Sequence, residues 1–271
     1  MDPSIIVGLL ILGIVAGIVG SLFGIGGGII FIPVLTIVYD LPAMEAAAIS
    51  LIGILALSAG AASYYTEHKV ANVRLGLFLE IGTTIGAIAG AFLAGMVEQW
   101  VLFTIFSIFV IINGFRMLFG HGKDCGSTEG EHEFYCRDLK TGETLGYDVE
   151  HRFAGSVICV FAGMYSSMTG VGGGVIKVPV MNSIMGVPMR AATATSSFMI
   201  GITAFCGAMV YFLNGQINIE FAAYIAISSY IGMLIGTRIS KLFDVSSLKR
   251  YFALVLFASA LSVMLKAGGI L

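Results

Sequence analysis

The chain has 271 residues, of which 58% are hydrophobic and 11% are charged, and its formal net charge is −2. So few charged side chains cannot cover the surface of a water-soluble globule. The composition therefore excludes a soluble domain and indicates a protein of the lipid bilayer, and no nucleic-acid partner is expected.

Eight segments have roughly the 20 apolar residues that a membrane-spanning helix needs. They are apolar on every side rather than alternating, which favours helices over the strands of a barrel. The first segment follows Asp2 rather than basic residues, so we expect it to be retained and not cleaved. We predict an all-α membrane protein with spanning helices at about 4–23, 43–65, 73–97, 100–119, 153–169, 189–212, 219–239 and 247–265.

The chain is internally duplicated. The residues GIGGGIIFIPVL at 24–35 recur as GVGGGVIKVPVM at 170–181, an offset of 146 positions, and the same offset pairs Ser50 with Ser196. Duplicated halves in an apolar chain are typical of transporters. We predict a first membrane repeat at 1–119, a linker at 120–151 and a second membrane repeat at 152–271.

Each glycine run is followed by a short apolar segment that contains a proline, at about 29–39 and 175–186. At 1.5 Å per residue, such a segment is roughly 17 Å long and does not span a bilayer comfortably. We predict a half-helix that folds back against the preceding helix, where surrounding protein or a watery cavity satisfies the irregular backbone. The chain then has ten helical segments, five in each repeat.

The positive charges predict the orientation. We place Lys69 and Arg74 in the cytoplasm, because Lys and Arg concentrate in cytoplasmic loops. If each glycine turn closes a hairpin with no net crossing, most other basic residues fall on the same side. Five segments per repeat is an odd number, so the second repeat is inverted relative to the first. This predicts a multi-pass protein of the cell membrane with both termini outside the cytoplasm.

The polar linker at 120–151 is predicted to lie in the cytoplasm. Its residues 135–147, YCRDLKTGETLGY, have the pattern of a β-hairpin with its turn at 140–143. The spacing H-x3-C-x6-H-x3-C matches no standard zinc finger, so a linker without metal is the alternative to a zinc site. No other cofactor is expected. The candidate zinc ligands are His121, Cys125, His132 and Cys136.

The triple glycines are candidates for binding an anion. Without side chains, their backbone N–H groups can converge on an oxyanion at the start of the following helix. In an inverted pair, two such turns approach each other around one central cavity. The alternative is close helix packing, which we favour for the isolated Gly82, Gly86 and Gly90. The predicted substrate-binding glycines are Gly26, Gly27, Gly28, Gly172, Gly173 and Gly174.

Lys177 lies three residues beyond the second glycine run, where the first repeat has Phe31. An ionisable group inside a membrane segment costs at least about 2.5 kcal/mol unless it is used or paired. We predict that Lys177 adds a positive charge to the anion site, with a lysine that reaches the membrane interface as the alternative. Hydroxyl groups in membrane helices either bind the anion or bond their own backbone. The candidates are Ser50, Thr193, Thr195, Ser196 and Ser197.

Glu80 lies within an apolar segment, and its counterpart in the second repeat is Ala226. One interpretation is that Glu80 carries a coupling proton. The other is that it forms a structural pair with a basic group. Sodium is the alternative coupling ion.

Several chemistries are not indicated. The histidines lie in loops or at segment ends and no paired carboxylates occur at membrane depth, so the protein is not expected to be an enzyme. Cys159 and Cys206 lie alone in apolar segments, which argues against redox transfer as the function. Because no Walker-type loop is present, ATP is not the direct energy source. A secondary transporter remains, with an anion channel as the alternative.

The segments GSLFGIGGGIIFIPVL and TGVGGGVIKVPVMNSIMGVPMRAATATS resemble the sulfite exporter TauE/SafE family, and the resemblance covers essentially the whole membrane part. It implies a membrane protein that moves sulfite, thiosulfate, sulfonates such as sulfoacetate, or related small anions. The acidic linker is not part of the family pattern. The family's glycine and proline elements correspond to Gly24, Gly26, Gly27, Gly28 and Pro33, and to Gly170, Gly172, Gly173, Gly174 and Pro179.

Together these features predict an alternating-access transporter of small sulfur-containing oxyanions, including organosulfonates related to sulfoacetate or taurine. Its partners are the lipid bilayer, the anion and a coupling proton or sodium ion, and the oligomeric state is left open. The alternatives are a passive anion channel and a membrane sensor that acts through its cytoplasmic linker.

Overall fold

The computed structural model describes residues 3–94, 132–139 and 142–242, together with residues 111, 250, 251 and 254. The predicted spanning helices at 100–119 and 247–265 lie almost wholly outside the described residues. The two repeats are therefore compared through their first four helical segments.

Every predicted helical segment within the described ranges is a helix. The first half contains α1 (Pro3–Phe23), α2 (Gly28–Ile37), α3 (Ala43–Glu67) and α4 (Val73–Leu93). The second half contains α6 (Arg152–Thr169), α7 (Gly174–Pro179) with the π-helical turn η1 (Val180–Ile184), α8 (Met189–Leu213), and α9 (Ile219–Ile239) with the 3₁₀ turn η2 (Ser240–Leu242). The short helices that follow the two glycine runs are α2 and α7.

Five of the described helices are long and apolar enough to cross a membrane: α1, α3, α4, α8 and α9 with η2. Large apolar side chains cover their outward faces. On α4, for example, Ile81, Ile85 and Phe92 are each more than three-fifths exposed. An all-α membrane protein is therefore the fold class, because such faces need lipid around them.

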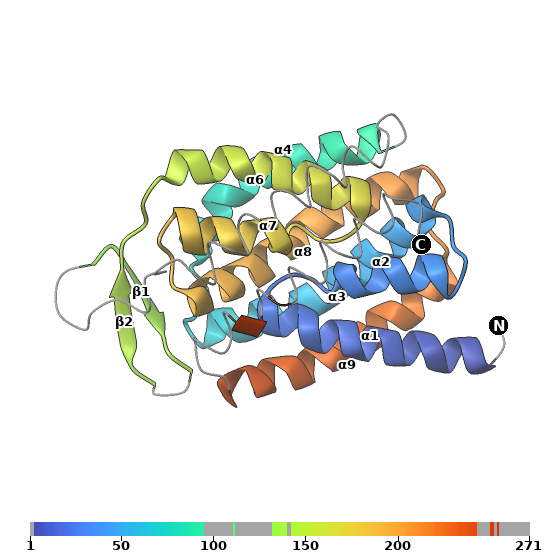
Figure 1. Cartoon of the computed structure of the whole chain (residues 1–271), viewed down its shortest axis with the longest axis horizontal. Coiled ribbons are helices and arrows are strands. Elements are labelled where there is room, and N and C mark those ends of the chain that lie inside the picture. The colour runs from blue at the N-terminus through green and yellow to red at the C-terminus, as the bar shows by residue number, and fades with distance from the viewer. Residues whose placement is uncertain are drawn as a thin grey trace.

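The helices pack as two units that each combine both halves of the sequence. The α1 unit contains α1, α2, α3 and α9, and the α6 unit contains α4, α6, α7 and α8. Figure 1 shows α4 with α6 at the top, α1 with α9 at the bottom, and the other four helices between them. Helix α3 of one unit packs along α8 of the other. Contacts between helices thus tie the two sequence halves together.

Glycines bring the outer helix pairs close together. A Cβ atom on Gly86 would overlap the carbonyl oxygen of Val160, and one on Gly90 would overlap that of Met164. On the other helix pair, a Cβ atom on Gly232 would overlap the carbonyl oxygen of Ile14. The packing interpretation of these isolated glycines is confirmed, since small residues let membrane helices approach backbone to backbone.

Residues related by the 146-residue offset make the same contacts. The hydroxyl of Tyr65 donates to the carbonyl of Ser21 at 2.9 Å, and the hydroxyl of Tyr211 donates to the carbonyl of Ser167 at 2.9 Å. In Figure 1, α1 runs from right to left, whereas α6 runs from left to right. The equivalent helices α1 and α6 therefore point in opposite directions.

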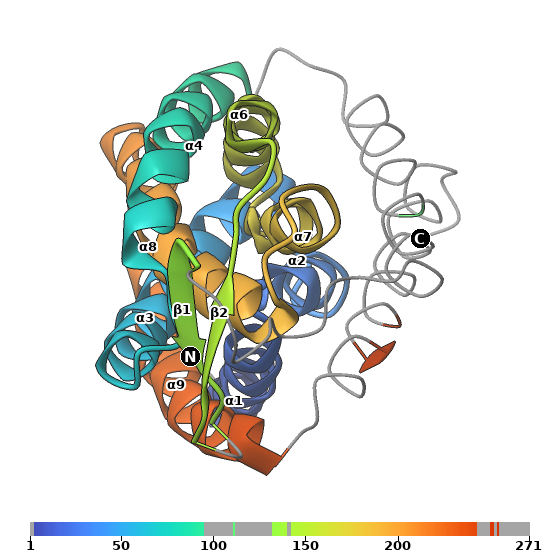
Figure 2. The same ribbon diagram turned by 90° about the vertical axis from the view of Figure 1, so that its left-hand side faces the viewer.

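The linker contains the predicted β-hairpin. Strands β1 (Phe134–Arg137) and β2 (Thr144–Tyr147) pair antiparallel, with Cys136 opposite Leu145. Figure 2 shows the hairpin lying across one end of the helix bundle. Cys136 and Tyr147 are buried in a core cluster that they share with the α6 unit. The hairpin is thus packed onto the membrane part.

Polar contacts attach this hairpin to the loops at the same end of the bundle. They include Arg137 N–H to the Lys69 carbonyl (3.1 Å), Glu150 N–H to the Met185 carbonyl (3.0 Å), Asn72 Nδ2 to the Tyr147 hydroxyl (2.8 Å), and Asp138 Oδ1 to Arg190 Nη1 (3.5 Å). Burial raises the pKa of the Tyr147 phenol, although its hydrogen bond with Asn72 acts in the opposite direction. The hydroxyl therefore stays protonated.

Replacement of Tyr147 by Phe tests how strongly this anchoring stabilises the fold. The variant leaves the buried Asn72 Nδ2 without its partner, so we expect a loss of about 1 to 3 kcal/mol. Thermal unfolding in detergent measures the change. Tyr135→Phe is the matched control, because Tyr135 is 55% exposed on the opposite face of the hairpin. Equal stability of the two variants would contradict an anchoring role.

Candidate functional site

Two glycine turns join long helices to half-helices. The first glycine turn is Gly24–Gly28, between α1 and α2, and the second is Gly170–Gly174, between α6 and α7. The turns differ at one position, because Gly27 has a left-handed φ of 77° whereas its counterpart Gly173 has a φ of −68°. Positive φ angles occur at Gly24, Gly26 and Gly27 in the first turn and at Gly170 and Gly172 in the second.

The two glycine turns touch each other, and the central cavity predicted between them stays a prediction. A Cβ atom on Gly28 would overlap the carbonyl group of Val171, and one on Gly174 would overlap the carbonyl oxygen of Gly24. Both turns are buried. The starts of the half-helices α2 and α7 therefore meet in the interior of the bundle, where only glycine permits this approach.

Each turn is braced by a serine from the opposite half. Ser50 of α3 donates to the carbonyl of Gly170 at 2.6 Å, and Ser196 of α8 donates to the carbonyl of Gly24 at 2.7 Å. These two bonds are equivalent under the repeat. Their hydroxyl protons are therefore used to hold the turns in place.

The other predicted hydroxyl groups bond to nearby backbone. Thr193 donates to the carbonyl of Arg190 at 3.0 Å, and Ser197 donates to the carbonyl of Thr193 at 3.0 Å. Thr195 accepts a hydrogen bond from the N–H of Asn72 at 2.9 Å, at the start of α4. For Thr193 and Ser197 the arrangement is the self-bonding alternative.

Lys177 and Glu80 form an ion pair with each other. Lys177 Nζ lies 3.1 Å from Glu80 Oε2 and donates to Thr203 Oγ1 at 2.7 Å, and the Thr203 hydroxyl donates to Glu80 Oε1. The exposed fractions are 0% for Lys177, 4% for Glu80 and 0% for Thr203. We call these residues the buried triad. It joins α7, α4 and α8 inside the α6 unit.

The buried triad shows which groups Glu80 and Lys177 contact. Glu80 pairs with a basic group, and its role as carrier of a coupling proton stays a prediction. The charge of Lys177 is correspondingly compensated rather than added alone to the glycine turn. Its stem still crosses that turn, because a Cβ atom on Gly173 would lie 3.1 Å from Lys177 Cε.

The equivalent positions in the α1 unit are apolar. The offset of 146 residues places Phe31, Leu57 and Ala226 there, and Phe31 and Leu57 are fully buried. The same packing can thus be built without charge. A buried ion pair is often no more stable than well-packed apolar side chains, so stability does not account for the triad. Because ionisable residues inside a membrane segment are functional-site candidates, the triad is the candidate functional site.

Thr203 was missed by sequence reasoning. Many hydroxyl groups occur in these apolar helices, and Thr203 belongs to no motif. Its counterpart is the apolar Leu57, just as those of Lys177 and Glu80 are Phe31 and Ala226. This signal is shared by Thr193, Thr195 and Ser197, whose counterparts are Ala47, Ile49 and Leu51, so it does not single out Thr203.

Comparison with known proteins decides the family. A family model described as sulfite exporter TauE/SafE matches residues 9–263. The chain belongs to the sulfite exporter TauE/SafE family. It is a multi-pass membrane transporter of this family and not an enzyme.

Curated membrane transporters align with the chain, two of the three described here over most of its length. A probable membrane transporter protein of Bacillus subtilis, YunE, is 25% identical over 257 residues, which cover 92% of this chain and 93% of YunE. A probable membrane transporter protein of Methanocaldococcus jannaschii is 26% identical over 252 residues, 86% of each chain. The sulfite exporter TauE/SafE family protein 5 of Arabidopsis thaliana is 28% identical over 109 residues, 40% of this chain and 24% of that protein. No solved structure matches the chain.

The linker of this TauE/SafE chain contains the candidate zinc ligands, of which His121 and Cys125 lie outside the described residues. His132 Nδ1 lies 3.0 Å from Asp148 Oδ2, and its ring covers Gly146 on one face of the hairpin. Cys136 is buried on the other face. The hairpin thus separates the two described members of the set. A zinc site stays a prediction.

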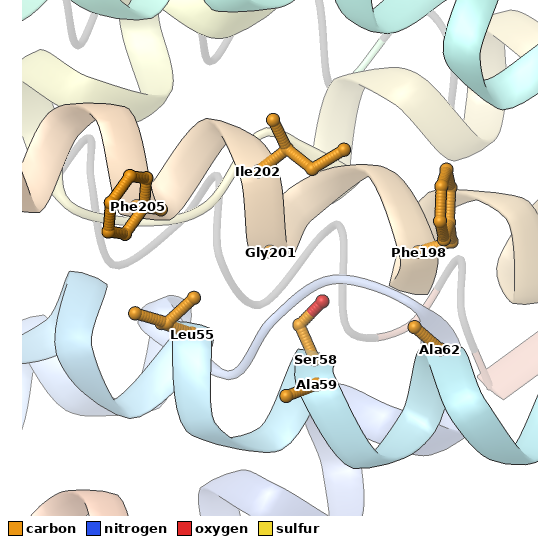
Figure 3. A pocket seen from close by; sticks show the side chains of 8 residues that line it. All are labelled: Leu55, Ser58, Ala59, Ala62, Phe198, Gly201, Ile202 and Phe205. Carbon is orange, nitrogen blue, oxygen red and sulfur yellow. The ribbon is translucent and has the colours of Figure 1, made fainter.

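An open groove of about 300 Å³ lies between α3 and α8 of the TauE/SafE bundle. Figure 3 shows the facing side chains of these two helices. The hydroxyl of Ser58 donates to the carbonyl of Ser197, so the polar group in the groove is already satisfied. The lining has no charge and does not suit an oxyanion: Leu55, Ser58, Ala59, Ala62, Phe198, Gly201, Ile202 and Phe205.

Replacing either of two adjacent glycines by alanine, at Gly172 or at Gly173, tests the backbone geometry of the second glycine turn. Gly172 has a φ of 88°, and a Cβ atom there would lie 2.8 Å from the carbonyl oxygen of Ile25. We expect Gly172→Ala to destabilise the protein by at least about 1 to 2 kcal/mol. Gly173→Ala is the control, because its φ is ordinary and the flexible Lys177 stem can shift. Thermal unfolding of the two variants compares them, and a larger loss at Gly173 would contradict the described turn.

Proposed function

We propose that this TauE/SafE protein is a secondary transporter of small sulfur-containing oxyanions, such as sulfite, thiosulfate or organosulfonates related to sulfoacetate and taurine. The observation that carries the proposal is a fully buried lysine whose stem lies against the second glycine turn. A buried ammonium group beside a helix start attracts a small anion. The name of the Arabidopsis relative, a sulfite exporter family protein, agrees with this substrate class.

The second glycine turn can supply further donors to the anion. Within the described part of the chain, the N–H groups of Gly172 and Gly173 make no hydrogen bond. Gly173 lies directly beside the Lys177 stem. We propose that these N–H groups and the Lys177 ammonium together replace the hydration of the oxyanion.

We also propose that the two repeats are inverted in the membrane, with both termini outside the cytoplasm. The opposite directions of α1 and α6 support this arrangement (Figure 1). The equivalent braces from Ser50 and Ser196 support it as well. Alternating access would then be a relative movement of the α1 unit and the α6 unit, which meet where α3 packs along α8.

Anion transport by a double variant tests the proposal. Lys177→Met alone would leave Glu80 buried and unpaired, which costs several kcal/mol by itself. Lys177→Met combined with Glu80→Gln removes both charges and keeps the packing. Relative to Glu80→Gln alone, loss of the charge-assisted contact should weaken anion binding by about 1.5 to 3 kcal/mol, or roughly ten- to more than a hundredfold.

The measurement is uptake of labelled sulfite or thiosulfate into liposomes that contain the purified protein. The wild-type protein should show saturable uptake and counterflow, and the folded double variant should have a higher half-saturating concentration than Glu80→Gln. Flux far above about 10³ per second without saturation would instead identify a channel. Equal uptake by the double variant and Glu80→Gln would place the anion site elsewhere.

A further inference from the structure

The carboxylate of Glu80 already binds Lys177 as a small oxyanion would. One of its oxygens accepts from the Lys177 ammonium at 3.1 Å, and the other accepts from the Thr203 hydroxyl. Thr203 in turn accepts from the same ammonium at 2.7 Å. Sulfite, thiosulfate and sulfonates also carry at least two oxygens on one central atom. Such oxygens can bridge an ammonium and a hydroxyl group in the same way.

We propose that Glu80 is a tethered competitor of the transported anion, and that protonation of Glu80 releases Lys177 to the anion. This inference rests on the proposed function. The proton binds the Glu80 carboxylate, its ion pair with Lys177 breaks, and the anion pairs with the ammonium in its place. The anion therefore enters together with one proton, and a monovalent anion leaves the net charge of the site unchanged.

Burial makes the two events dependent on each other. A fully buried ammonium without a counter-charge is strongly unfavourable. Lys177 therefore pairs either with the ionised Glu80 or with the substrate anion. A site in which both negative charges are absent is rarely populated. This requirement couples proton movement to anion movement without any additional contact between the two.

Thr203 has an alternative partner when the carboxylate departs. Its hydroxyl also lies 3.2 Å from the carbonyl of Met199, one turn earlier in α8. The hydroxyl can turn to that carbonyl and still accept from Lys177. The triad can thus open without leaving a buried hydroxyl unsatisfied.

The surroundings of Glu80 contain other titratable groups. Lys177 faces it from α7, and the thiols of Cys159 on α6 and Cys206 on α8 lie close enough to interact electrostatically. Thiols are ordinarily neutral at neutral pH, so they do not balance the charge of Lys177. The Glu80 carboxylate is therefore the group that the substrate anion replaces as the partner of Lys177.

Proton uptake by the wild-type protein gives a direct test. Thiosulfate is the probe, because its own charge does not change near neutral pH. Adding thiosulfate to the purified full-length protein in weakly buffered detergent solution should raise the pH of the solution, with about one proton taken up per bound anion. Binding without proton uptake would overturn the inference.

The pH dependence of thiosulfate affinity gives a second test. Wild-type affinity should rise as the pH falls, by up to roughly tenfold per pH unit. Glu80→Gln should bind at neutral pH at least about tenfold tighter than the wild type and lose this pH dependence. Glu220→Gln removes an exposed carboxylate from the start of α9 and should behave as the wild type. A Glu80→Gln variant that keeps the wild-type pH dependence, or binds more weakly at every pH, would overturn the inference.

If Glu80→Gln folds poorly, its thermal unfolding with and without thiosulfate replaces the affinity measurement. The variant leaves Lys177 unpaired, so its unfolding temperature should fall without anion and rise more than that of the wild type when thiosulfate is added. Absence of this recovery contradicts competition. If the wild type binds none of thiosulfate, sulfite and sulfoacetate, the proposed function fails and the inference fails with it. Binding without pH dependence overturns the inference alone.

Discussion

The fold depends on the contact between two glycine turns. Main-chain atoms of the first turn lie directly against those of the second, so any side chain at Gly28 or Gly174 would push the turns apart. Ser50 and Ser196 then fix each turn from the opposite half of the chain. Because α2 and α7 begin at these turns, the contact sets where both half-helices start.

The start of α7 determines where the charge lies. From this point the Lys177 side chain passes Gly173 and reaches α4 and α8, where Glu80 and Thr203 meet it. The helices on the other side of the contact are arranged in the same way but present apolar side chains. The two halves thus repeat helices and contacts, whereas the buried charged side chains of the described residues all lie in the α6 unit. Because either set of side chains satisfies packing, this difference supports the proposed function of the triad.

Much of the fold could be predicted from the sequence, because each feature has a local signal. Length and apolarity locate the helices, and the repeated glycine runs locate both half-helices. The pairing of Lys177 with Glu80 has no local signal, because 97 residues and several helices separate the partners. The backbone of Gly173 was also unpredictable. Its counterpart Gly27 is left-handed, so sequence identity between the repeats did not imply identical conformation.

The sequence likewise did not indicate that α9 packs against α1, or that α4 packs against α6. The duplication indicates two equivalent halves, but it does not say which helices of one half pack on the other. That choice depends on long-range contacts such as Gly86 against Val160 and Gly232 against Ile14. Comparison of equivalent positions narrows the candidates to polar residues with apolar counterparts, but Thr203 shares this property with Thr193, Thr195 and Ser197.

The hairpin is attached to one of the two helical units. It contacts Asn72 at the start of α4 and Arg190 at the start of α8, and both helices belong to the α6 unit. The described residues form no equivalent structure at the opposite end of the bundle. A relative movement of the two units, as proposed above, would therefore carry the hairpin with the α6 unit. The linker thus makes the two ends of a repeated helical bundle chemically different.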